Sequence, residues 1–236
     1  MSTVILARHG RTTANADGVL AGRTDVGLDE TGRDQAARMA ERLRPVPLTA
    51  VVSSPLERCR QTSTAILQRQ TGSPVTPVEP GITECDYGEW QGRRLADLAK
   101  EALWSTVQKR PSQAAFPGGE SLAAMQSRAA AAVRRHDAAF EAEHGPGATW
   151  VAVSHGDVIK SILADAFGMR LDDFQRIHVD PGSLSIVRYT SDRPEVFATN
   201  SDAGDLSWLK EGSAVEAQVG GGAGPQVPQV PTHAQP

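Results

Sequence analysis

The stretch that decides the fold is residues 3–15, which read TVILARHGRTTAN. Residues 4–7 are an apolar run that is too short for a helix and predicts a buried strand. The strand ends in Arg8, His9 and Gly10, where a glycine lets the backbone turn sharply. Ligands bind at the carboxyl ends of the strands in open α/β sheets. A cation and an imidazole in this place therefore indicate a candidate binding site.

A second strand end of the same kind lies far along the chain. Residues 149–154 form another apolar run, and the imidazole of His155 with a following glycine comes directly after it. Parallel strands present their carboxyl ends at one edge of a sheet. If these two strands are neighbours, we expect the imidazoles of His9 and His155 to face one pocket.

Two guanidiniums can join the two imidazoles. Arg8 ends the first strand, and Arg58 falls in the first turn of a predicted helix that follows a third apolar run, residues 50–53. Charge-assisted hydrogen bonds to oxyanions are short and strong, and the guanidinium fork matches phosphate geometry. The pattern predicts a phosphate site, in which a neutral imidazole held in one tautomer by a carbonyl group can act as the nucleophile.

Apolar periodicity and turn signals predict alternating strands and helices through most of the chain. Strand, helix, strand is a parallel crossover unit, so the predicted fold class is α/β with a mostly parallel sheet. Besides the strands named above, we predict a short strand at 74–79, late strands at 184–189 and 195–199, and helices at 31–43, 56–70, 92–103, 121–143 and 157–167.

The chain of 236 residues reads as one domain, residues 1–211, followed by a segment of different composition. Residues 212–236 are rich in glycine, proline, valine and glutamine and have no periodic apolar face, which predicts a disordered tail. An exposed sheet edge in the domain could pair two subunits into a homodimer.

Composition narrows the class of protein. A formal net charge of -4 disfavours a strongly basic nucleic-acid binder, and no apolar run approaches the roughly 20 residues of a membrane span. No basic segment followed by an apolar segment marks a secretory signal at the N-terminus. Cys59 and Cys85 have neither metal-ligand nor disulfide-framework spacing. We therefore expect a cytoplasmic protein that acts on neither nucleic acid nor membranes.

Four segments, taken in order, resemble one known family. They are RHG at residues 8–10 followed by Thr12 and Asn15, SSPLERCRQT at 53–62, Glu84 ahead of YGEWQG at 87–92, and SHG at 154–156. Together they resemble the histidine phosphatase superfamily, which includes cofactor-independent phosphatases and cofactor-dependent phosphoglycerate mutases. The resemblance implies a three-layer α/β/α sandwich of the phosphoglycerate mutase type.

The resemblance also implies a role for each residue. His9 would attack phosphorus and become phosphorylated, while Arg8, Arg58 and His155 hold the phosphate oxygens. Glu84 would give a proton to the leaving oxygen and later take one from water, which favours turnover at mildly acidic pH. Asp86 and Glu89 are rivals of Glu84 for this role.

The resemblance further implies a phosphate contact from Asn15, with Thr12 or Arg11 nearby. Arg11 either recognises a second anionic group or faces solvent. Neither a metal nor another cofactor is implied, and no carboxylate or thiolate cluster supports a metal site at the two histidines.

Three functions remain open. Mutases of this family carry clustered arginines and a proline run after the acidic glutamate, whereas residues 93–120 here have Arg93 and Arg94 but lack the Arg-Arg-Ser-Tyr and polyproline pattern. A less sealed pocket lets water reach phosphohistidine. We therefore favour a phosphatase acting on phosphate monoesters of small metabolites. The alternatives are a phosphoglycerate mutase and a phosphate-binding module without catalysis.

Overall fold

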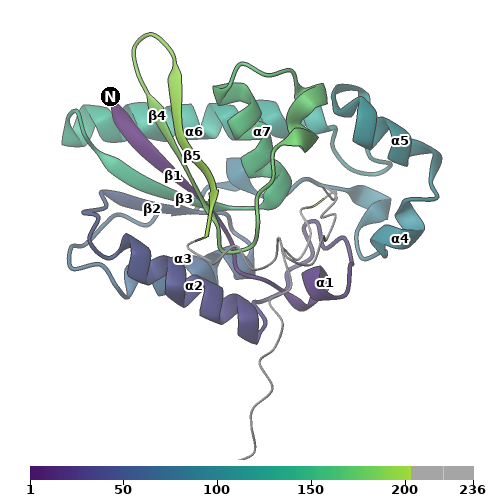
Figure 1. Ribbon diagram of the computed structural model, residues 1–236, viewed down its shortest axis with the longest axis horizontal. Helices are drawn as coiled ribbons and strands as arrows, with labels where there is room; N and C mark the ends of the chain where they lie inside the picture. The colour runs from purple at the N-terminus through teal and green to yellow at the C-terminus, as the bar shows by residue number, and fades with distance from the viewer. Residues whose placement is uncertain (203–219, 221–236) are drawn as a thin grey trace, which may run out of the picture.

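Five strands form one sheet in the order β2-β3-β1-β4-β5, and helices cover both of its faces (Figure 1). The structure is a computed structural model that describes residues 1–202 and Gly220. Strands β1, β2 and β3 run parallel, while β4 runs antiparallel to both β1 and β5. The strands are β1 Ser2–Arg8, β2 Ala50–Ser53, β3 Thr149–Ser154, β4 Leu184–Tyr189 and β5 Pro194–Ser201.

Alternating side chains of the strands feed two separate cores. Val4 and Leu6 of β1 pack on the side of α6 and α7, whereas Ile5 and Ala7 pack on the side of α2 and α3. These helices are α2 Glu30–Leu43, α3 Glu57–Leu67, α6 Leu122–His144 and α7 Gly156–Ala166. The two helical layers with the sheet between them confirm the predicted three-layer α/β/α sandwich (Figure 1).

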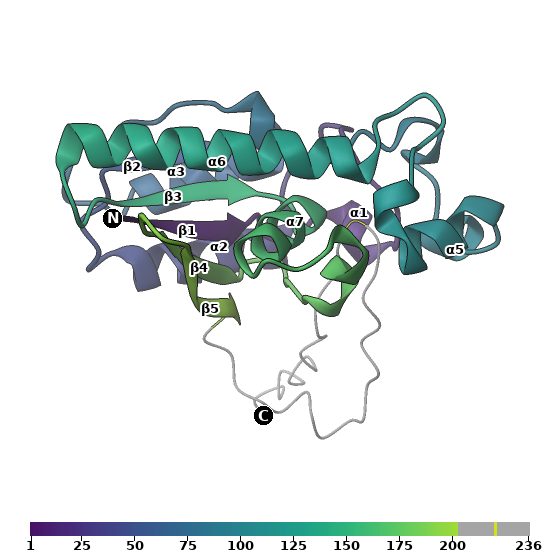
Figure 2. The same ribbon diagram turned by 90° about the horizontal axis from the view of Figure 1, so that it is seen from above.

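Smaller elements gather beyond the carboxyl ends of β1 and β3. Figures 1 and 2 both place α1 and α5 there, while α6 runs along the whole length of β3. The short elements are α1 Thr13–Ala16, α4 Leu95–Leu98, α5 Ala102–Lys109 and the 3-10 turns η1 Pro80–Ile82, η2 Gly88–Trp90, η3 Pro111–Gln113 and η4 Leu171–Arg176. This end of the sheet is where the sequence predicts the site.

The predicted helix at residues 92–103 is wrong. The segment forms two short helices, α4 and α5, and α5 continues six residues beyond the predicted end at residue 103. Leu98 and Val107 are both fully buried. They are nine positions apart, which places them on opposite faces of a straight helix. The break between α4 and α5 lets both side chains reach the same core.

The predicted strand at residues 74–79 forms only isolated parallel bridges to β2, at Val75 and Val78. Pro74 and Pro77 lack the N–H groups that a full ladder needs. In the described part of the chain, no helix is both long enough and apolar enough to cross a membrane.

Candidate active site

Sheet register brings the two histidines together. Arg8 of β1 pairs with Ser154 of β3, so the next residue of each strand, His9 and His155, emerges at the same edge. The backbone N–H of His9 donates to the carbonyl oxygen of Ser154 at 3.1 Å. The two imidazole rings lie edge to face, with centroids 5.2 Å apart. Two residues that are remote in the sequence therefore form one cluster.

Two contacts define the tautomer of His9. Its Nδ1 lies 2.7 Å from the carbonyl oxygen of Gly10, which can only accept, so Nδ1 carries the proton. Nε2 then has the lone pair, and Arg58 Nε donates to it at 3.3 Å. Burial, followed by the positive charges of Arg58 and Arg8, holds the pKa of His9 well below its usual range. A neutral nitrogen is thus available as a nucleophile near neutral pH.

Main-chain carbonyl groups hold the two buried guanidiniums in place. Arg8 Nη1 donates to the carbonyl oxygen of Val179 at 2.8 Å. Arg58 donates from Nη1 to the oxygen of Thr24 at 3.0 Å and from Nη2 to that of Gly22 at 2.7 Å. Both charges are therefore preorganised around His9, an arrangement suited to a phosphoryl group whose charge must be neutralised.

His155 lies at the N-terminal end of α7, where unpaired N–H groups favour an anion. Its Nε2 is 2.8 Å from Ser54 Oγ and 3.5 Å from Cys59 Sγ. Burial, then the charges of Arg58 and other neighbours, lowers the pKa of His155 well below its usual range. Burial also raises the pKa of the Cys59 thiol to about 12, so this thiol stays protonated and is no rival nucleophile.

Glu84 is the one buried carboxyl among the three acids considered for proton transfer. Asp86 is half-buried and accepts from the N–H of Gly88, and Glu89 is exposed. Glu84 Oε1 accepts from the N–H of Cys85 at 2.9 Å. Burial first, and the nearby charge of Asp157 second, raise the pKa of Glu84 to about 7. A carboxyl of this kind is poised both to give and to take a proton near neutrality.

Asp157 was not singled out from the sequence, yet it is completely buried beside the site. Its Oδ2 accepts from the hydroxyl of Tyr87 at 2.8 Å and from the N–H of Gly220 at 2.9 Å, and its Oδ1 lies 3.5 Å from Lys160 Nζ. Lys160 also donates to Gln175 at 3.1 Å. The sequence did carry a signal for Asp157. This residue lies two positions after His155, and Lys160 follows it by one helical turn.

Gly220 is the one described residue of the C-terminal segment. The rest of the tail predicted at residues 212–236, and the predicted domain boundary at residue 211, lie outside the described residues.

The three residues predicted to bind substrate do different things. Thr12 and Asn15 form a reciprocal capping box at the start of α1, in which Asn15 Oδ1 accepts from the N–H and the hydroxyl of Thr12. Arg11 donates to Asp29 Oδ2 at 2.7 Å and to the hydroxyl of Thr31 at 2.9 Å. The guanidinium of Arg11 is therefore partnered at the start of α2 instead of lying free in solvent.

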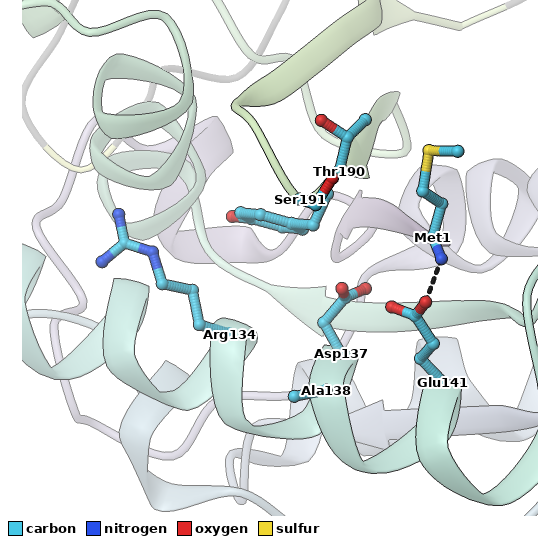
Figure 3. Close-up of a pocket in the computed structure, with 8 residues that line it drawn as sticks. Met1, Arg134, Asp137, Ala138, Glu141, Thr190 and Ser191 are labelled. Atoms are coloured by element: carbon cyan, nitrogen blue, oxygen red, sulfur yellow. Dashed lines mark hydrogen bonds and ion pairs between the residues drawn. The ribbon is translucent and has the colours of Figure 1, made fainter.

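A separate groove lies at the other end of the sheet. Its volume is about 410 Å³, and it is lined by Met1 at the amino end of β1, by Tyr189 at the end of β4 and by side chains of α6 (Figure 3). The terminal amine of Met1 pairs there with Glu141. This groove is remote from His9. Within the described residues, no group of three or more histidines, cysteines and acids is placed to hold a metal ion.

Comparison with known proteins identifies the family. A sequence model of the histidine phosphatase superfamily (branch 1) matches residues 4–202. The 2,3-bisphosphoglycerate-dependent phosphoglycerate mutase 2 of Gloeobacter violaceus is 28% identical over 183 residues, which are 76% of this chain and 82% of that protein.

Bifunctional protein Rv2228c of Mycobacterium tuberculosis is 32% identical over 191 residues. The match covers 80% of this chain but spans only 50% of the length of that protein. The crystal structure of the alpha-ribazole phosphatase from Shigella flexneri aligns with a TM-score of 0.74 at 26% identity, covering 86% of this chain and 98% of that one. With its paired strand-end histidines, this chain belongs to the histidine phosphatase superfamily.

Proposed function

We propose that this protein is a phosphatase that hydrolyses phosphate monoesters of small metabolites through a phosphohistidine intermediate on His9. The observation that carries the proposal is the state of His9. Its Nδ1–H donates to the Gly10 carbonyl oxygen, so Nε2 carries the nucleophilic lone pair, and Arg58 Nε lies 3.3 Å from it. The nucleophilic nitrogen of His9 therefore lies next to a guanidinium that can bind the phosphate.

In the first step, His9 Nε2 attacks phosphorus in line with the leaving oxygen. The N–P bond forms, the P–O bond breaks, and Glu84 gives its proton to the leaving oxygen. Arg8, Arg58 and His155 hold the other phosphate oxygens. We include Asn15 among the phosphate contacts, with Thr12 supporting it and Arg11 further out. Most of the catalysis in phosphoryl transfer comes from fixed donors that stabilise the charge of the transition state, because the protein takes little part in the covalent changes.

In the second step, water attacks the phosphohistidine. Glu84, now a carboxylate, takes the proton from the water, the N–P bond breaks, and inorganic phosphate leaves with His9 and Glu84 restored. Unassisted hydrolysis of phosphate monoesters is so slow that enzymes accelerate it by up to about 10²¹-fold. A single acid that works in both directions suits a pKa near the working pH, as burial gives Glu84.

A phosphoglycerate mutase is the second candidate, because the Gloeobacter relative bears that name. In this chain Arg93 is exposed and paired with Glu101, which leaves it poorly suited to clamp a phosphoglycerate. The phosphatase assignment therefore has the better support.

A screen of phosphorylated metabolites that includes 3-phosphoglycerate tests the choice. We expect stoichiometric inorganic phosphate from at least one ester, with no loss in the presence of a chelator and no product from His9→Ala. Accumulation of 2-phosphoglycerate without free phosphate would establish a mutase. Tight phosphate binding with no turnover of any ester would leave only a binding module.

A further inference from the structure

Two guanidiniums donate hydrogen bonds to the backbone of Glu84, the proposed proton donor. The carbonyl oxygen of Glu84 accepts from Arg23 Nε at 3.2 Å and from Arg128 Nη2 at 3.1 Å. Arg128 belongs to α6 and also donates to the carbonyl oxygen of Gly81 at 2.8 Å. Arg23 comes from the loop that follows α1. The position of the Glu84 backbone thus depends on side chains from two remote segments.

Glu120 ties the two guanidiniums together. Its Oε1 accepts from Arg23 Nη2 at 3.1 Å, from Arg128 Nη2 at 2.6 Å and from the N–H of Asp86 at 2.9 Å. Although burial alone would raise it, the hydrogen bonds from Arg128 and from the Asp86 N–H hold the pKa of Glu120 below its usual range. The carboxylate stays charged and holds both guanidiniums on the Glu84 carbonyl oxygen.

The neighbours of Arg23 hold the other half of the site. The carbonyl groups of Gly22 and Thr24 accept from Arg58, and Arg58 in turn contacts His9 Nε2. One tripeptide, residues 22–24, therefore supports the nucleophile through its backbone and the proton donor through the Arg23 side chain.

We propose that Arg23 is a positioning residue that sets the place of Glu84 relative to the His9 phosphate site. This inference rests on the proposed function, in which Glu84 is the proton donor. A general acid acts only within hydrogen-bond reach of the atom it protonates, and a displacement of about 1 Å can cost ~100-fold in rate. Among the described residues, Arg128 is the one remaining donor to the Glu84 carbonyl oxygen in Arg23→Ala.

A direct contact between Arg23 and substrate is the competing interpretation. Its donors are already committed to the Glu84 carbonyl oxygen, to Glu120 and, at 3.5 Å, to Asp86 Oδ2. The side chain is 40% exposed, so removing it leaves no buried cavity. The Gly22 and Thr24 carbonyl groups that hold Arg58 remain in Arg23→Ala.

The test compares two phosphate monoesters that differ in their need for an acid. Phenyl phosphate has a poor leaving group that must be protonated, whereas 2,4-dinitrophenyl phosphate leaves as a stable anion. For Arg23→Ala we expect kcat/KM on phenyl phosphate to fall between about 10- and 100-fold, and kcat/KM on the dinitrophenyl ester to change by less than about threefold. The ratio kcat/KM is compared because it reports the step in which the leaving group departs, whereas kcat also includes the hydrolysis of phosphohistidine. Arg23→Lys keeps the charge but not the fork, so we expect partial recovery on phenyl phosphate.

Arg93→Ala, which removes an exposed arginine paired with Glu101, is the matched control and should leave both rates unchanged. In Glu84→Gln, adding Arg23→Ala should cause no further loss on phenyl phosphate, because both changes act on one step. Equal losses of kcat/KM on both esters, with kcat lowered, would overturn the inference in favour of a general structural role. A rise in KM alone would overturn it in favour of a substrate contact.

The Glu84→Gln variant distinguishes a failure of this inference from a failure of the proposed function. If Glu84→Gln is selective for phenyl phosphate and Arg23→Ala is not, only the role of Arg23 is wrong. If the loss of kcat/KM in Glu84→Gln is the same for both esters, the proton-donor assignment fails. The role of Arg23 then fails with it.

Discussion

The backbone of the sheet places His9 and His155, whereas side chains from a remote loop and from α6 hold the backbone of Glu84. The register of β1 and β3 fixes the two imidazoles 5.2 Å apart. Glu84 lies between two 3-10 turns, and its carbonyl oxygen is held by Arg23 and Arg128. The phosphate side of the site is thus built from regular structure, and the proton-donor side from an ion-pair cluster. We expect changes around Glu84 to lower kcat without weakening the binding of phosphate.

The largest expected effect comes from removing the proton donor itself. Glu84→Gln keeps the size of the side chain but cannot donate an acidic proton, so kcat on an ester with a poor leaving group should fall by about 10²- to 10⁴-fold. Inhibition by inorganic phosphate should stay close to wild type, since the four groups that we propose bind phosphate, those of Arg8, Arg58, His155 and Asn15, are intact. Steady-state kinetics with phosphate as a competitive inhibitor measures both quantities.

Glu89→Gln, which alters an exposed carboxyl five residues along, should behave as wild type. A large loss in Glu89→Gln with a small one in Glu84→Gln would exchange the roles of these two acids.

A glycine contact offers a way to move the proton-donor loop without touching a titratable group. A Cβ added at Gly119 would lie 2.2 Å from the carbonyl oxygen of Asp86, so the two backbone segments must separate. For Gly119→Ala we expect about 1–3 kcal/mol of lost stability. We also expect roughly a tenfold or greater fall in kcat.

Gly72→Ala is the control, because nothing lies within 4 Å of the added methyl group. Thermal unfolding and kcat should be measured on both variants. If Gly119→Ala weakens phosphate binding as much as it lowers kcat, the two sides of the site are not independent.

The pH dependence should report Glu84. This group works as an acid only while it is protonated, so activity should be full below its pKa of about 7 and fall as the pH rises through that value. His9 has a pKa well below its usual range, so its protonation limits activity only in more acidic solution. A rate that rises steadily to pH 9 would contradict the assignment.

Asp157→Asn sharpens this prediction. Burial is the main cause of the raised pKa of Glu84, and the Asp157 charge is the second. Removing that charge should move the alkaline limb of the kcat/KM profile to lower pH without abolishing it. Asp34→Asn, at an exposed site on α2, should leave the limb in place. An unmoved limb in Asp157→Asn would show that Asp157 does not act on Glu84.

The smallest effect is expected at Arg11. Its guanidinium pairs with Asp29 and Thr31 at the start of α2. Arg11→Ala should therefore cost at most about 1 kcal/mol of stability and should leave KM close to wild type. A tenfold or larger rise in KM, measured with the best ester from the screen, would instead place Arg11 among the substrate contacts.

The same contrast explains what could be predicted from the sequence. Strands β2, β3 and β4 begin and end at the predicted residues, because short apolar runs with polar ends specify buried strands. The carboxyl ends of parallel strands lie at one edge of the sheet. The meeting of His9 and His155 could therefore be anticipated on the condition that their strands are neighbours. These features depend on local pattern and on one simple rule of topology.

The support of Glu84 could not be anticipated in that way. Arg23 is 97 positions from Glu120, and nothing in the local pattern of either residue signals the other. Glu120 and Arg128 are only eight positions apart, but both are remote from Glu84 in the sequence. The buried Asp157 was missed for a similar reason, since its partner Tyr87 comes from another segment. The split between α4 and α5 also depends on tertiary burial, which a helical period does not record.

If His9 is the nucleophile, its Nε2 carries the phosphoryl group during turnover. The most direct measurement is a rapid quench with a ³²P-labelled ester that the enzyme turns over, followed by peptide mapping. We expect one label, stable in base and lost in acid, on the peptide that contains His9, and none in His9→Ala. Continued turnover without label on His9, or label on another residue, would contradict it.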